Sequence, residues 1–317
     1  MKTIERSFRL EASEGLGGKP RPELIGPVLA HLHETLQDSV RMGFLHSSRA
    51  RGRVPTSLRL AADVRYVGHS ADGDTATLLH FEAPTFGEAA ADLYRQQSLW
   101  EDGPQPEQTA FELLGAALSD IAGRCADSNR FDSGLLHRLA RYRRMFGRGH
   151  LNRIALPDVA LPHPGQLDAA VAESAKAMYS ATPPSRRVRV TGRLDVLGVS
   201  QGILKLDLGN GNVVTARWEG DIDVVALRDH LNRDVVIEGN AIFRPSGGLL
   251  RVDASAIAAA TARDDFFRTV PAGIMATDWQ RIARLRPNEK SAYLRILGGI
   301  PAEESDEEFA AAVEALS

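Results

Sequence analysis

The stretch of sequence that decides the fold spans residues 187–257 and reads RVRVTGRLDVLGVSQGILKLDLGNGNVVTARWEGDIDVVALRDHLNRDVVIEGNAIFRPSGGLLRVDASAI. Five segments of it alternate apolar and polar residues, which is typical of strands with one buried face. One segment, Ile222–Leu231, has helical spacing instead and stands between the third and fourth strands. The predicted strands are Val188–Leu197, Gly202–Leu208, Val213–Trp218, Asp234–Phe243 and Leu249–Ile257.

Three strands, a helix and two strands follow one another in the order of an OB-fold, so this stretch resembles that small Greek-key barrel, which commonly holds single-stranded nucleic acid or a protein partner. Glycine-rich turns at residues 209–212 and 246–248 fit two of the strand connections. The apolar faces of the five strands would fill one small interior. They comprise Val188, Val190, Leu194, Val196, Leu204, Leu206, Leu208, Val214, Ala216, Trp218, Val235, Ile237, Ala241, Phe243, Leu250 and Val252.

The composition limits the classes of protein to which the chain can belong. With 317 residues, 43% of them hydrophobic and 25% charged, it is long enough for two or three compact units. A net charge of -3 argues against a protein that coats nucleic acid through its overall charge, so any basic site must be local. The single cysteine, Cys125, excludes an internal disulfide. Because neither a signal-peptide stretch nor a run of about 18 apolar residues occurs, we expect a cytoplasmic protein without membrane contact.

The predicted fold class is α+β, with four parts along the chain. Residues 1–150 form an α+β domain, residues 151–185 a proline-rich connector with one helix, residues 186–258 the OB-like barrel, and residues 259–317 a helical tail. Within the first domain the patterns predict strands over Ser7–Ala12, Ser57–Val67 and Thr75–Phe81 and helices over Pro22–Leu45, Phe86–Trp100, Glu107–Cys125 and Gly134–Phe146.

A basic stretch at residues 134–153 is the first candidate for a binding site. It holds six arginines, two histidines and no acidic residue, and in a helix one of its faces would be basic and the other apolar. Such a stripe suits a phosphate backbone, and a solvated amphipathic helix is the alternative. The outward face of the first three barrel strands adds basic residues but few rings for base stacking. Predicted nucleic-acid contacts, with DNA and RNA both open, are Arg138, Arg141, Arg144, Arg148, Arg193, Lys205 and Arg217.

The end of the chain has the pattern of a short amphipathic helix. Ser305 and Glu308 have the spacing of a capping box, and the apolar stripe that follows needs something to pack on. The segment 298–309, GGIPAEESDEEF, resembles the tails of bacterial antitoxins, in which such a helix engages a toxin. The resemblance implies a toxin-antitoxin or phage-defence role and a protein partner, a toxin or an effector, bound through Phe309, Val313 and Leu316.

No residues have the spacing of a catalytic, metal or cofactor site, and we therefore expect none of the three. Residues 198–202 match the G-x-S-x-G pattern of serine hydrolases but join two predicted strands, whereas that motif joins a strand to a helix. Arg144 and His150 match the short pattern of HEPN-type ribonucleases, so one alternative is a nuclease in the N-terminal unit. A structural subunit whose barrel contacts only protein is the other. The sequence favours a non-enzymatic protein that binds nucleic acid and a protein partner.

Overall fold

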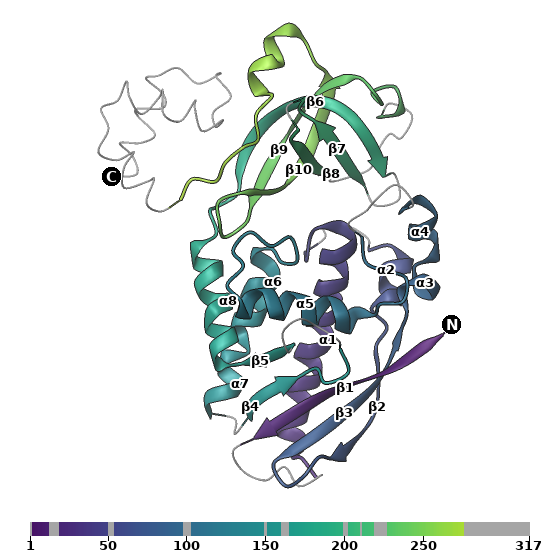
Figure 1. Cartoon of the computed structure of the whole chain (residues 1–317), viewed down its shortest axis with the longest axis vertical. Coiled ribbons are helices and arrows are strands. Elements are labelled where there is room, and N and C mark those ends of the chain that lie inside the picture. Colours follow the sequence, from purple (N-terminus) through teal and green to yellow (C-terminus); the bar gives the residue numbers. More distant parts are fainter. Residues whose placement is uncertain are drawn as a thin grey trace, which may run out of the picture. The chain divides into compact units, whose positions relative to one another are not determined.

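The computed structural model describes residues 2–12, 19–49, 54–97, 103–148, 151–159, 165–198, 202–209, 211–218 and 227–275. The chain divides into two compact units, residues 1–180 and residues 181–317 (Figure 1). Unit 1 combines a sheet with helices, and unit 2 contains a closed five-stranded barrel. The predicted α+β class is therefore confirmed.

The sheet of unit 1 is antiparallel and has the strand order β2-β3-β1-β4-β5. Gly73 closes the β2–β3 hairpin with a φ of 76°, the left-handed conformation for which a glycine after an aspartate is suited. Central strand β1 pairs with both β3 and β4, so segments far apart in the sequence share one sheet. The strands are β1 (Thr3–Ala12), β2 (Arg65–Ala71), β3 (Ala76–Pro84), β4 (Leu151–Ala155) and β5 (Gln166–Asp168).

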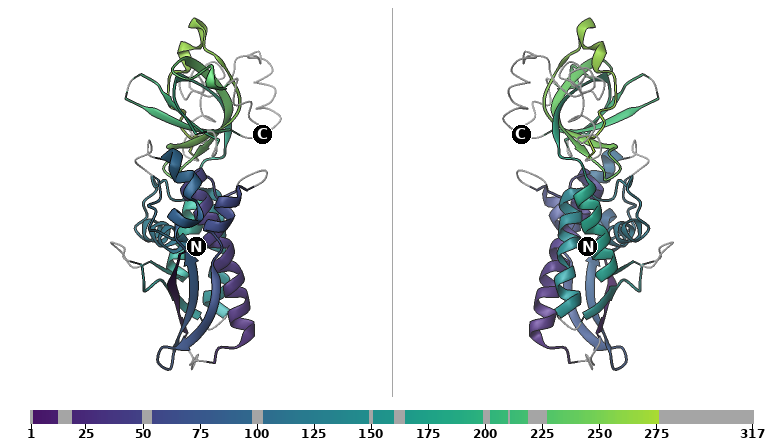
Figure 2. Two further views of the ribbon diagram at one scale, coloured as in Figure 1. Left: turned by 90° about the vertical axis from the view of Figure 1, so that its right-hand side faces the viewer. Right: turned by 90° about the vertical axis from the view of Figure 1, so that its left-hand side faces the viewer.

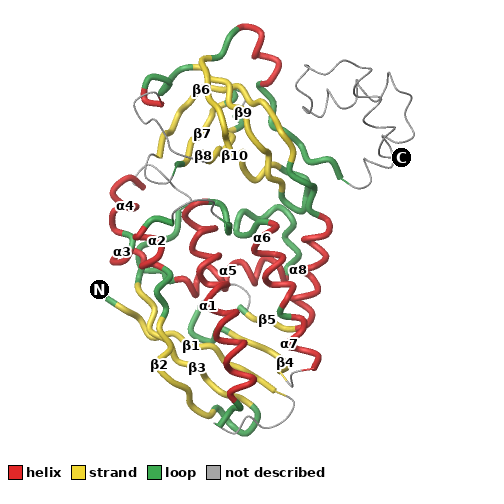
Figure 3. The backbone as a smooth tube through the Cα atoms, turned by 180° about the vertical axis from the view of Figure 1, so that it is seen from behind, coloured by secondary structure: helices red, strands yellow, loops and turns green. Residues whose placement is uncertain are grey.

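Helices pack on one face of this sheet, as the alternation along β1 requires (Figure 3). Phe8 is fully buried, and its ring lies 4.8 Å from the ring of Phe111 in the helical layer. On the opposite face Glu11 forms ion pairs with Arg9 and Arg153. The helices are α1 (Pro22–Leu45), α2 (Thr56–Ala61), α3 (Phe86–Ala89), α4 (Ala91–Gln97), α5 (Ala110–Ala122), α6 (Ser133–Arg141), α7 (Arg143–Arg148) and α8 (Ala169–Ala181).

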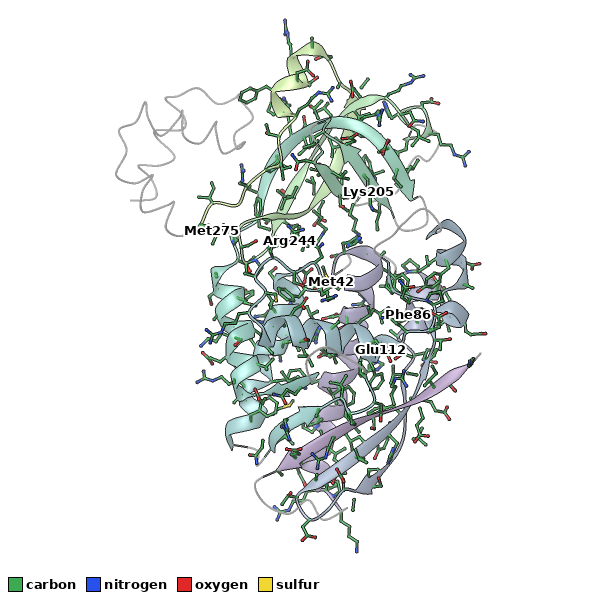
Figure 4. All side chains as sticks on the ribbon, in the orientation of Figure 1. Met42, Phe86, Glu112, Lys205, Arg244 and Met275 are labelled. Carbon is green, nitrogen blue, oxygen red and sulfur yellow. The ribbon has the colours of Figure 1, made fainter. Side chains whose placement is uncertain are left out.

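Glu112 ties helix α5 to the sheet (Figure 4). It accepts hydrogen bonds from the backbone N of Thr109 at 2.8 Å and from Nε of Arg6 on β1 at 2.9 Å. The first of these belongs to a capping box that satisfies the free N–H groups at the start of α5. One carboxylate thus both begins the helix and anchors it on β1.

Two segments of unit 1 differ from the prediction. Residues 57–61, predicted as part of a strand, are helical: Leu58 and Ala61 are buried at a spacing of three while Leu60 is exposed. Residues 151–180, predicted to begin the connector, instead supply β4, β5 and α8 to unit 1. The helix predicted within that segment is α8.

Unit 2 contains a closed barrel (Figure 2). The order of its strands is β10-β8-β7-β6-β9. Strands β8 and β10 pair in parallel, whereas the other neighbours are antiparallel. This five-stranded closed barrel is compatible with an OB-like fold. Its strands are β6 (Arg186–Gly198), β7 (Ile203–Asp207), β8 (Val213–Trp218), β9 (Asp234–Phe243) and β10 (Leu249–Ala259), so all five predicted strands are found.

The barrel interior contains most of the predicted apolar set, with two exchanges. In β6 a register shift between Leu194 and Val196 makes Leu197, rather than Val196, pack against the core. In β10 a shift after Leu249 places that residue in the barrel core, while Leu250 is buried outside this core. Each shift is a bulge, and an extra residue in one strand reverses the alternation beyond it.

The connection between β8 and β9 is described only in part. Of the helix predicted at residues 222–231, residues 222–226 lie outside the described residues, residues 227–228 are helical and residues 229–231 form a turn instead. After β10 the chain forms a short 3-10 helix, η1 (Ala262–Phe267). The predicted tail helix, with Phe309, Val313 and Leu316, also lies outside the described residues.

Candidate nucleic-acid interface

The predicted basic helix is two helices, α6 and α7, separated by Tyr142, which keeps helical dihedral angles of -61° and -21°. Asp132 caps α6 by accepting a hydrogen bond from the backbone N of Leu135 at 3.0 Å. The same carboxylate accepts hydrogen bonds from Ser48 Oγ at 2.5 Å and from Ser48 N at 3.0 Å. An N-cap contributes about 1 kcal/mol, and this one also holds α6 against the segment that follows α1.

The apolar face of these helices sets the direction of the basic face. Leu135, Leu139 and Tyr142 are fully buried. The hydroxyl of Tyr142 lies 2.9 Å from Oγ1 of Thr35 on α1, so the buried phenol has a hydrogen-bond partner. Residues on the other side of α6 and α7 therefore face outward, as the helical pattern predicts.

Arg138 does not lie on the outward face. Its guanidinium forms ion pairs with Asp38 and Glu34, both on α1. The side chain of Asp38 is 3% exposed, and burial raises the pKa of its carboxyl even though Arg138 favours the charged form. Arg138 therefore serves as the counterion of a buried carboxylate, and we leave it out of the candidate interface.

Arg141 and Arg144 are exposed and form no ion pair with any described residue. Their neighbour Arg143 differs, because its Nε lies 3.0 Å from Oε2 of Glu173 on α8. Arg148 ends α7, and its side chain lies outside the described residues. Two of the six arginines of the basic stretch are thus shown to present charge to solvent.

Tyr179, near the end of α8, is a residue that the sequence did not mark as functional. Its ring centroid lies 5.1 Å from that of His137 on α6, and 42% of the residue is exposed. Residue spacing gives no signal for it, because Tyr179 follows Ala172 and Ala175 at helical spacing and so falls on the apolar side of α8. Its place beside the basic face depends on how α8 packs, which residue spacing does not reveal.

On the barrel, carboxylates accompany the predicted basic residues. Arg193 on β6 is 53% exposed, with Nη2 lying 3.3 Å from Asp195 and 3.6 Å from Asp207. Arg217 on β8, expected to be exposed on the outward face, is buried, and its partner in the β10 register is Asp253. Lys205, labelled in Figure 4, lies half-buried on β7. The barrel face is therefore less basic than the sequence pattern indicates.

One arrangement in unit 1 has the order of a catalytic triad. Oγ of Ser70 lies 2.8 Å from Nε2 of His80, and Nδ1 of His80 lies 3.5 Å from Oε1 of Glu5. Glu5 has a side chain 77% exposed on the open face of the sheet, so water competes for its carboxylate. We assign it no catalytic role.

The described part of the chain contains neither a metal-binding cluster nor a membrane-spanning helix. No cluster of three or more histidine, cysteine, aspartate or glutamate side chains there is arranged to hold a metal ion. None of the described helices has the length and apolar character needed to cross a membrane.

Comparisons with protein-family models, with curated proteins and with solved structures find no match to this chain.

Proposed function

We propose that this protein binds nucleic acid, with the outward face of α6 and α7 contacting phosphates. The observation that carries the proposal is the pair of exposed arginines, Arg141 and Arg144, which have no acidic partner among the described residues. Arginine suits this task because its guanidinium donates two parallel hydrogen bonds to a phosphate. Three other arginines of the same stretch are already paired with carboxylates, so only part of the stretch is available.

The OB-like barrel supports the same proposal more weakly. Barrels of this kind bind oligonucleotides through the face of their second and third strands, which here are β7 and β8. Lys205 belongs to that face, and Arg193 on the adjacent β6 keeps an exposed guanidinium. We therefore propose the barrel as a second contact for nucleic acid or for a protein, subordinate to α6 and α7.

Charge reversal tests the main contact. The variant Arg141→Glu/Arg144→Glu is expected to bind labelled DNA and RNA roughly 10- to 100-fold more weakly than the parent chain, because phosphates dominate affinity. Fluorescence anisotropy at a fixed salt concentration of about 100 mM measures the change. Arg59→Glu/Arg124→Glu is the matched control, since it reverses two exposed arginines elsewhere in unit 1. Equal binding by the reversed variant and the control would refute the proposal.

We further propose a protein partner for the tail, on the basis of its resemblance to antitoxin tails. Replacing Phe309, Val313 and Leu316 by serine is expected to abolish co-purification with the product of the neighbouring gene, which we take to be a toxin or effector. If the parent chain and the triple serine variant retain the same product equally, these three residues are not the partner-binding surface. Nuclease activity through Arg144 and His150 gains no support, because His150 lies outside the described residues.

A further inference from the structure

Helix α8 runs antiparallel to α6 and α7. Two contacts establish the direction: Tyr179 meets His137, and Glu173 meets Arg143. Going from the first contact to the second, the chain advances six residues along α6–α7 and goes back six along α8. The two helical segments therefore lie beside each other over that length (Figure 1).

This packing places an aromatic ring at one end of the basic face. Residues four apart on a helix have Cβ atoms about 5–6 Å apart, so Arg141 follows His137 directly on the surface of α6. Tyr142 keeps helical dihedral angles, and Arg144 is therefore the next outward residue. The resulting row is Tyr179, His137, Arg141 and Arg144, and we call it the ring–arginine row.

We propose that the ring–arginine row binds single-stranded nucleic acid, with one base stacked on Tyr179 and the phosphates that follow it contacting Arg141 and Arg144. This inference rests on the proposed function and names its ligand class. Alternating stacking rings and cations are the means by which proteins hold single strands without reading sequence. DNA and RNA share that chemistry.

Single strands are favoured over a duplex for a physical reason. A base stacks on a protein ring only if the face of the base is free, and in a duplex both faces are covered by neighbouring base pairs. Arg141 and Arg144 alone would bind the phosphates of either form. The ring of Tyr179, 42% exposed at the end of the row, is the element that distinguishes them.

The experiment compares substitutions of Tyr179 in the full-length chain. The probes are fluorescein-labelled oligo-dT and oligo-rU of about 20 nucleotides and a duplex of the same length, at about 50 mM salt. Tyr179→Leu is expected to weaken single-strand binding roughly 5- to 100-fold, which corresponds to the loss of one stacked base, while duplex binding changes less than about twofold. Tyr179→Phe retains the ring and is expected to bind as the parent chain does.

Tyr66 provides the matched control, because it is also 42% exposed but lies on strand β2. Tyr66→Leu is expected to leave both affinities unchanged. If Tyr179→Leu binds single strands as well as the parent chain does, this inference is overturned while the proposed function stands. If the parent chain binds none of the three probes, both are overturned.

Discussion

At the scale of single residues, the sequence pattern does not distinguish the arginines of the basic stretch, but their contacts in the structure do. Arg138 neutralises a buried carboxylate, Arg143 links two helices, and Arg141 and Arg144 point to solvent. Their side chains are chemically identical, so the environment alone makes the difference. Only the arginines without a nearby carboxylate retain charge to offer to a ligand.

Removing the counterion of Asp38 is expected to destabilise unit 1. Arg138→Met keeps most of the apolar stem but leaves a carboxylate with a 3% exposed side chain without that partner. Breaking a buried ion pair in this way costs about 3 kcal/mol of unfolding free energy. Urea denaturation at pH 7, followed by circular dichroism, measures the loss.

The cost is expected to shrink as the pH falls. Burial holds the pKa of Asp38 above its ordinary value of 3.8, and loss of Arg138 raises it further. A carboxyl with a raised folded-state pKa stabilises the fold below its unfolded pKa, and that stability is lost as the pH rises through the folded value. The variant should therefore approach the parent chain near pH 4. Asp38→Asn/Arg138→Met should recover most of the stability at pH 7, and a deficit that persists there would disprove the counterion role.

At the scale of elements, the strand boundaries follow from alternation but the bulges do not. Val196 and Leu197 are both apolar, as are Leu249 and Leu250, so either member of each pair fits an inward position. Strand pairing selects Leu197 and Leu249, because each bulge inserts one unpaired residue. Where two apolar residues are adjacent, pairing with the neighbouring strand decides which of them points into the core, and the local pattern cannot predict it.

The closure of the barrel at β9 and β10 depends on Gly239. A Cβ atom there would lie 2.8 Å from Cα of Ala254 and would also overlap the backbone oxygen of Asp253. Because backbone atoms cannot rotate away, Gly239→Ala is expected to cost at least about 2 kcal/mol. Hydrogen exchange with mass spectrometry should show lost protection in β9 and β10 and unchanged protection in β1 and β3, since the two units have separate cores.

Gly68 on β2 is the control for that substitution. A Cβ atom at this position would meet nothing within 4 Å. Gly68→Ala is therefore expected to change stability by less than about 1 kcal/mol. Equal effects of the two substitutions would show that Gly239 is not required for close strand approach.

At the scale of the whole molecule, the net charge of -3 means that the proposed nucleic-acid binding would have to come from a local basic surface. The affinity of a single strand falls with salt by about 0.7 logarithmic units for each phosphate neutralised. Arg141→Gln/Arg144→Gln is therefore expected to reduce the slope of log K against log salt by about 1.4. Titrations between about 50 and 200 mM salt measure the slope.

Arg130 supplies the control for the slope, because its charge is already matched by Asp120 at 2.9 Å. Arg130→Gln should leave the salt dependence as it is in the parent chain. An unchanged slope in the Arg141 and Arg144 variant would mean that phosphates are bound elsewhere.

The sequence by itself determined the α+β class, the five barrel strands and the inward face of α6, because alternation and helical spacing record which residues are shielded from water. Only the tertiary structure decided which arginines are neutralised, which strand residues bulge, and which helix brings a tyrosine beside the basic face. The pairing of Arg138 with Asp38 and the contact of Tyr179 with His137 join segments more than 30 residues apart, whereas the bulges depend on pairing with a neighbouring strand. Local residue spacing contains no information on partners from distant segments, so ion pairs and ring contacts between such segments can be identified only in the folded chain.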